Sequence, residues 1–156
     1  MRSTLPEIVS SSNRLASAAL LALAAAGTVF TALAVDPMHP DASLRPIYGA
    51  AMMCGALAGW LHMRRGLGDG IGRAALGGVS AAISGLIYFM FFAGLRQVVR
   101  VYNFTQFKSV AELLEYMIER MVDVFWIAAG PPTLFTILIG GALAGMLSEA
   151  IRLWWD

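Results

Sequence analysis

The sequence predicts an all-α membrane protein: a bundle of four transmembrane helices with a long amphipathic helical hairpin between the third and the fourth. Its composition is one reason. Hydrophobic residues make up 58% of the 156 residues and charged residues 13%, whereas soluble domains are about 45–50% apolar and roughly 25% charged. The second reason is four apolar runs of about the 20 residues that a helix needs to cross a bilayer. We therefore expect a single membrane domain, residues 1–156.

The first apolar run covers residues 15–35, contains no charged residue, and ends at the sequence DPMHPD. Preceded by Arg2 and Arg14, it also resembles a cleavable signal peptide. The run is longer than the usual signal core of about 7–15 residues, which favours a retained helix. The second run covers residues 46–63 and ends at the arginine-containing sequence RRGLGDGIGR.

The third run covers residues 71–95 and the fourth covers residues 125–147. A Gly-Pro-Pro sequence at residues 130–132 interrupts the fourth run. Proline removes a backbone hydrogen-bond donor and kinks helices. We therefore predict a bend that joins two helix segments near the outer end of this span.

Lys and Arg in the loops set the orientation of a multi-pass protein. Four spans place the N-terminus, the second loop and the C-terminus on one side of the membrane. That side holds six basic residues, Arg2, Arg14, Arg64, Arg65, Arg73 and Arg152, and the other side holds five, Arg45, Arg96, Arg100, Lys108 and Arg120. The tight second loop carries three of the six, so we expect both termini in the cytoplasm.

An amphipathic helix is predicted at residues 109–122. Ser109 followed by Glu112 fits the S-x-x-E capping box, in which side chains satisfy backbone amides at the start of a helix. Apolar residues then recur at three- and four-residue spacing, and Glu112, Glu115 and Glu119 share the opposite face. The third helix is expected to extend to about Tyr102, so that the two form a hairpin.

Charged residues of this hairpin are the candidate docking residues. Arg96 and Arg100 lie one turn apart and are expected to pair with Glu115 or Glu119 across the hairpin. The acidic face has two interpretations, a solvated surface or a docking face for another protein. Binding to lipid headgroups is disfavoured, because interfacial helices are usually basic on their polar face.

The sequence GALAG occurs twice, at Gly55–Gly59 and at Gly141–Gly145. A GxxxG spacing lets helix backbones approach closely in lipid. These four glycines are the candidate helix-packing residues. They are expected to pack within the bundle, against each other, or against other chains.

The sequence gives no sign of chemistry. A single cysteine excludes an internal disulfide and a CxxC motif, and a net charge of +1 indicates no nucleic-acid partner. The Met, Cys and His residues near the second run and in DPMHPD have poor spacing for one metal ion. Hydrolase, zinc-protease and nucleotide-binding motifs are missing from the sequence. We therefore predict a non-enzyme with no catalytic, cofactor-binding or metal-binding residues.

From about Tyr48 to Trp155 the order of these features resembles the TrgA-type tellurium-resistance membrane proteins of alphaproteobacteria. The resemblance rests on GALAGW before the arginines, GLGDGIGRAALGGVSA, a helix ending in LRQVVRVYNF, the acidic VAELLEYMIERMVDVFW, and a final LIGGALAGMLSEAIRLWW. It covers roughly two thirds of the chain and includes no catalytic signature. It implies a multi-pass protein of the bacterial inner membrane.

Two functions follow as expectations. The first is a small accessory subunit of a larger inner-membrane complex, respiratory or photosynthetic, with other membrane-protein subunits or further copies of the chain as partners in the bilayer. It would dock through its GxxxG faces and its acidic hairpin. The alternative is a self-contained oxyanion (tellurite) resistance protein or a small transporter.

Overall fold

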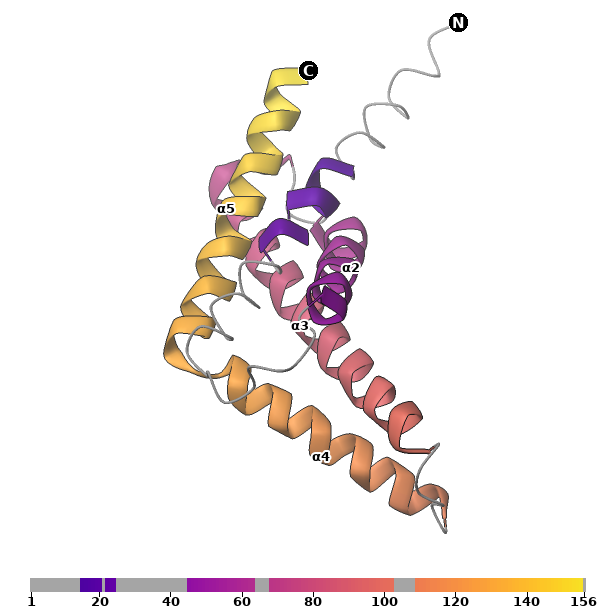
Figure 1. Ribbon diagram of the computed structural model, residues 1–156. Helices are drawn as coiled ribbons and strands as arrows, with labels where there is room; N and C mark the ends of the chain where they lie inside the picture. Colours follow the sequence, from indigo (N-terminus) through magenta and orange to yellow (C-terminus); the bar gives the residue numbers. More distant parts are fainter. Residues whose placement is uncertain (1–14, 21, 25–44, 64–67, 103–108, 156) are drawn as a thin grey trace, which may run out of the picture.

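A computed structural model describes residues 15–20, 22–24, 45–63, 68–102 and 109–155 (Figure 1). Within these residues the chain is all-helical and contains no strand. The labelled helices are α2 (Arg45–His62), α3 (Ile71–Tyr102), α4 (Val110–Ala128) and α5 (Pro131–Trp155). A short apolar helix, Leu15–Ala24, precedes them and is called the N-terminal helix below.

The centre of the fold is α3, which contacts α2, α4 and α5. In Figure 1, α2 and α5 flank its first half, and α4 runs back from the far end of its second half toward α5. With 32 residues, α3 is about 48 Å long at 1.5 Å per residue. That exceeds the roughly 30 Å of bilayer hydrocarbon, so one end of α3 extends beyond any membrane it crosses.

Among the described residues, two helices are long and apolar enough to cross a membrane, over Ile71–Arg100 and Pro131–Trp154. The expected span at residues 46–63 is helical, but α2, with Arg45 and His62 at its ends, is not one of these two helices. The expected span at residues 15–35 is described only as far as Ala24, and the rest of it lies outside the described residues.

The fourth expected span, residues 125–147, differs from the observed helix. Residues 125–128 belong to α4, and the apolar helix α5 begins only at Pro131 and continues to Trp155. The predicted bend is confirmed, because α4 ends and α5 begins on either side of Gly130 (Figure 1). Prolines are tolerated in the first turn of α5, where a backbone N–H has no helical partner in any case.

The end of α3 and the start of α4, the two helices of the hairpin, lie where the sequence predicts them. The long helix α3 ends at Tyr102, as expected. At the start of α4 the amide of Glu112 donates a hydrogen bond to the Ser109 Oγ at 3.2 Å, which is the predicted N-cap. The predicted turn at Asn103 and Thr105 lies outside the described residues.

Candidate functional site

The tightest contact in the molecule is the seam between α3 and α5. A Cβ built on Gly145 would overlap the carbonyl oxygen of Ala74, and one on Gly78 would overlap that of Gly141. A Cβ on Gly141 would lie 2.8 Å from the Ala82 Cβ. Because these neighbours are mostly backbone atoms, nothing larger than glycine fits without moving the helices apart.

The other GALAG sequence packs elsewhere. A Cβ on Gly59 would lie 2.7 Å from the carbonyl oxygen of Ser17 in the N-terminal helix. The Cα of Gly55 lies 3.6 Å from the position of a Cβ on Gly85 of α3. Of the packing modes left open by the sequence, the structure therefore shows packing within the bundle. The first GALAG sequence packs against the N-terminal helix and α3, and the second packs against α3.

A buried carboxylate closes the seam at its far end. The side chain of Glu149 is 1% exposed and forms an ion pair with Arg152, 2.8 Å from Oε1 to Nη2. Its Oε2 accepts hydrogen bonds from the backbone amide of Gly68 at 3.0 Å and from the Nε of Arg152 at 3.2 Å. Gly68 has φ of 102°, a conformation that favours glycine. Glu149 thus ties the loop before α3 to the last turns of α5.

Ser148, next to Glu149, makes a second contact between α5 and the segment that follows α2. Its Oγ donates to the carbonyl oxygen of Ala144 at 2.8 Å and approaches the Sδ of Met63 at 3.8 Å. Met63, directly after α2, is 1% exposed and belongs to the buried core. The end of α2 is therefore fixed to the same face of α5 that packs on α3.

Sequence reasoning missed Ser148 and Glu149 because they follow the expected end of the fourth span at residue 147. The sequence nevertheless contains a pattern that includes both residues. Gly141, Gly145, Ser148, Glu149 and Arg152 recur at three- and four-residue spacing, so they form one stripe along α5. A carboxylate on a stripe of small residues, one turn from an arginine, indicates a buried and paired group.

The contact between α3 and α4 is of a different kind. A Cβ on Gly94 would meet the Cγ atoms of Met117 and Met121, both at 3.0 Å, and the carbonyl oxygen of Met117 at 3.2 Å. The two nearest contacts are with flexible side chains, which adapt where backbone cannot. The hairpin is therefore held mainly by side-chain contacts that can adapt.

The expected ion pairs across the hairpin are not formed. No ion pair in the described part of the chain joins Arg96 or Arg100 to Glu115 or Glu119, and all four side chains are exposed. The reason is helical rotation. A residue two positions from Gly94 lies about 200° around α3, so Arg96 points away from α4.

The same geometry applies to α4. Glu119 lies two positions after Met117, about 200° around the helix, and so points away from α3. Below, Arg96 and Arg100 are called the basic edge of the hairpin, and Glu112, Glu115 and Glu119 its acidic edge. Both edges are exposed.

Near the end of the acidic edge, the side chain of Arg120 interacts with residues of its own helix, α4. Its Nη1 lies 2.7 Å from the Oδ2 of Asp123, and its guanidinium lies over the ring of Tyr116 at 5.2 Å. Hydrogen bonds with Tyr116 and Asp123 raise the pKa of Arg120 above its usual value, so it stays charged.

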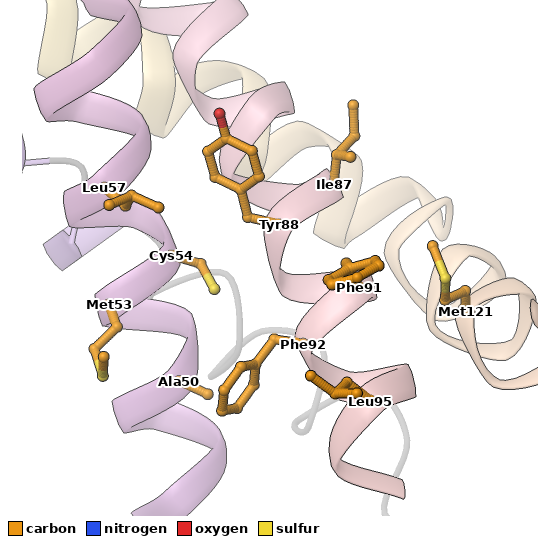
Figure 2. A pocket seen from close by; sticks show the side chains of 10 residues that line it. All are labelled: Ala50, Met53, Cys54, Leu57, Ile87, Tyr88, Phe91, Phe92, Leu95 and Met121. Atoms are coloured by element: carbon orange, nitrogen blue, oxygen red, sulfur yellow. The ribbon is translucent and has the colours of Figure 1, made fainter. Parts of the chain in front are cut away.

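An open apolar groove of about 570 Å³ lies between α2, α3 and α4 (Figure 2). Its volume is within the roughly 300–1,000 Å³ of small-molecule pockets. It is lined by Ala50, Met53, Cys54, Leu57, Ile87, Tyr88, Phe91, Phe92, Leu95 and Met121. Figure 2 shows Met121 of α4 reaching toward Phe91 of α3, so the hairpin forms one wall of the groove.

The groove continues into an exposed apolar surface on the hairpin, the hairpin face. It consists of six side chains, each between 45% and 58% exposed, namely Phe91, Leu95 and Val99 of α3 and Leu114, Ile118 and Phe125 of α4. Phe91 and Leu95 belong to both the groove and the hairpin face. Exposed apolar surface that is bordered by charges is typical of a site that contacts protein or membrane.

The described residues contain no group of three or more His, Cys, Asp or Glu side chains that could hold a metal ion. The acids and histidine of DPMHPD lie outside the described residues, as do Arg2, Arg14, Arg64 and Arg65, on which the expected orientation depends.

Comparison of the chain with protein-family models, with curated proteins and with solved structures gave no significant match. The resemblance to TrgA-type proteins and the link to tellurium resistance therefore stay predictions.

Proposed function

We propose that this chain is a non-enzymatic accessory subunit of a larger complex in the bacterial inner membrane, which it crosses four times with both termini in the cytoplasm. The observation that carries the proposal is the hairpin. An apolar face with a charged edge on each side is left uncovered there, beyond the part of α3 that packs against α2 and α5.

The distribution of glycines supports this role. Gly59, Gly78, Gly141 and Gly145 are used inside the molecule, so these faces are already occupied and are not free for a partner. The sequence alone led us to expect that both the GxxxG faces and the acidic hairpin dock to a partner. With the glycine faces occupied, the hairpin is left for this role. The proposed docking surface is the hairpin face with its two edges.

The alternative function, oxyanion resistance or transport by this chain alone, needs a polar path for an anion. The groove is lined by apolar side chains with one hydroxyl, on Tyr88, and one thiol, on Cys54. Such a lining offers no compensation for the desolvation of a charged oxyanion. The groove therefore favours the subunit role over the transport role.

The proposal is tested by isolating a tagged copy from native membranes in mild detergent and identifying the proteins that accompany it in fixed stoichiometry. We expect a stable assembly that is lost when Glu112, Glu115 and Glu119 are all changed to Lys. Asp69→Lys, which alters charge away from the hairpin, is the matched control and should leave the assembly intact.

A wild-type chain that migrates only as a monomer would contradict the subunit role. Flux of tellurite into vesicles that contain the purified chain would then be the measurement that supports the alternative.

A further inference from the structure

The two charged edges and the hairpin face have a fixed arrangement, which helical geometry gives directly. Successive residues of an α-helix are about 100° apart. With Gly94 facing α4, Leu95 lies about 100° around α3 and Arg96 about 200°. The apolar face of α3 is therefore at right angles to the hairpin contact, and the basic edge is on the outside.

The other helix follows the same sequence of directions. With Met117 facing α3, Ile118 lies about 100° around α4 and Glu119 about 200°. Because α4 runs antiparallel to α3 (Figure 1), equal rotations on the two helices turn toward the same side of the hairpin. Leu95 and Ile118 thus share one flat face, with positive charge along one edge and negative charge along the other.

The part of the hairpin face that belongs to α4 is poorly suited to contact with lipid tails. The helix carries Glu112, Glu115, Glu119 and Asp123 along its length, and such charges are costly within hydrocarbon. A helix that lies on the bilayer surface usually presents Lys and Arg to the headgroups. The single basic residue of α4, Arg120, is already paired with Asp123. A protein surface is the cover that suits this face.

We propose that a second copy of this chain covers the hairpin face, around a twofold axis parallel to α3 and α4, so that the basic edge of each copy meets the acidic edge of the other. A rotation of this kind exchanges the two edges, which brings opposite charges together on both sides. Arg96 and Arg100 are one turn apart, and so are Glu115 and Glu119, so the edges match in spacing. Two copies inserted in the same membrane direction are related by such an axis, and twofold dimers are the commonest oligomers.

The proposed dimer rests on the proposed function only in placing α4 outside the hydrocarbon. It assigns a second copy of the chain, and not an unrelated subunit, to the docking surface on the hairpin, because charge complementarity is present within one chain. The apolar groove lies at the edge of the same face and shares Phe91 and Leu95 with it, so dimer formation would also cover part of the groove.

The test uses two differently tagged full-length copies expressed together and isolated in mild detergent. The wild-type copies should co-isolate. A variant with a reversed acidic edge (Glu115→Arg and Glu119→Arg) should no longer recover its own kind, and neither should a variant with a reversed basic edge (Arg96→Glu and Arg100→Glu). We expect recovery to fall more than about tenfold in each case.

The decisive arm expresses these two variants together. One then has two positive edges and the other two negative edges, so they should recover each other even though neither recovers itself. This arm also shows that both variants are folded. A single chain with all four changes should again pair with itself.

The dimer would be overturned if the wild-type copies did not co-isolate, if the reversed variants co-isolated as before, or if the two variants did not recover each other. If other subunits still accompany the wild-type chain, the accessory role stands and only the dimer is wrong. If a vesicle surface of anionic lipid binds the hairpin in place of a second copy, the dimer is also wrong.

Discussion

The two halves of α3 are packed in opposite ways. In its first half, Gly78 brings α3 against the backbone of α5 at Gly141 and Gly145. In its second half, Gly94 brings α3 against the side chains of Met117 and Met121 in α4. Backbone cannot yield and methionine can. The first contact therefore fixes the fold, while the second leaves a surface that can adapt to a partner.

The treatment of charge shows the same difference. At the seam, the one carboxylate is buried and paired within the chain, through Glu149 and Arg152. At the hairpin, basic and acidic side chains face outward on opposite edges and leave the exposed apolar face between them. Charges that are satisfied internally stabilise a fold, whereas charges that point outward in a complementary pattern are available for recognition.

The largest effect is expected from Gly145→Leu. The added Cβ alone would overlap the carbonyl oxygen of Ala74 and lie 2.8 Å from its carbonyl carbon. Overpacking against backbone should cost about 3 kcal/mol or more, seen as a lower midpoint of thermal unfolding in detergent. Gly72→Leu is the control, because a Cβ there meets nothing within 4 Å. Equal midpoints for the two variants would show that the seam is not closely packed.

The next effect is expected from Glu149→Ala. This change removes the carboxylate that accepts hydrogen bonds from the Gly68 amide and from Arg152. Loss of buried hydrogen bonds to a charged group costs about 2 kcal/mol, and hydrogen exchange at the Gly68 amide should become faster. The exposed Glu115→Ala should change stability by less than about 0.5 kcal/mol. Unchanged exchange at Gly68 in Glu149→Ala would mean that the carboxylate does not hold this loop.

Features with a local cause could be predicted from the sequence. The N-cap at Ser109 and the bend at Gly130 each depend on residues within one helical turn, and the structure shows both. The all-helical character and two of the apolar helices follow from composition and length. The expectation of four spans goes further than the two helices that qualify by length and composition.

Features that depend on the rotation and choice of partner helices could not be predicted. GxxxG spacing indicates close packing but does not name the partner, so the sequence left open which helix Gly145 contacts. Arg96 and Glu115 have opposite charge in adjacent helices, yet each points away from the other helix. Their pairing within one chain was therefore wrong, although the choice of these residues as exposed docking candidates stays a prediction.

A smaller effect, confined to the hairpin, is expected from Ser109→Ala. The Ser109 Oγ accepts a hydrogen bond from the amide of Glu112, and loss of an N-cap costs about 1 kcal/mol. Amides in the first turn of α4 should exchange faster while the unfolding midpoint of the whole protein changes little. Ser80→Ala, an exposed position in the first half of α3, is the control. A fall in midpoint as large as that of Glu149→Ala would indicate that the hairpin and the seam unfold as one unit.

The smallest effect is expected from Gly94→Ala, and it tests the contrast between the two halves of α3 most directly. Replacing glycine by alanine in a helix interior stabilises it by about 0.5–1 kcal/mol. At Gly94 the new methyl group meets the Cγ atoms of Met117 and Met121 at 3.0 Å and the Met117 carbonyl oxygen at 3.2 Å. The methionines can shift, so gain and loss should nearly cancel.

At Gly78 the same substitution cannot be accommodated by a side-chain shift, because the new methyl group would overlap the Gly141 carbonyl oxygen. The midpoint of thermal unfolding should therefore fall clearly for Gly78→Ala and stay nearly unchanged for Gly94→Ala. If both variants lose stability equally, the hairpin contact is as rigid as the seam. Its face would then be unable to adjust to a second copy, and the charge pattern alone would have to carry the recognition.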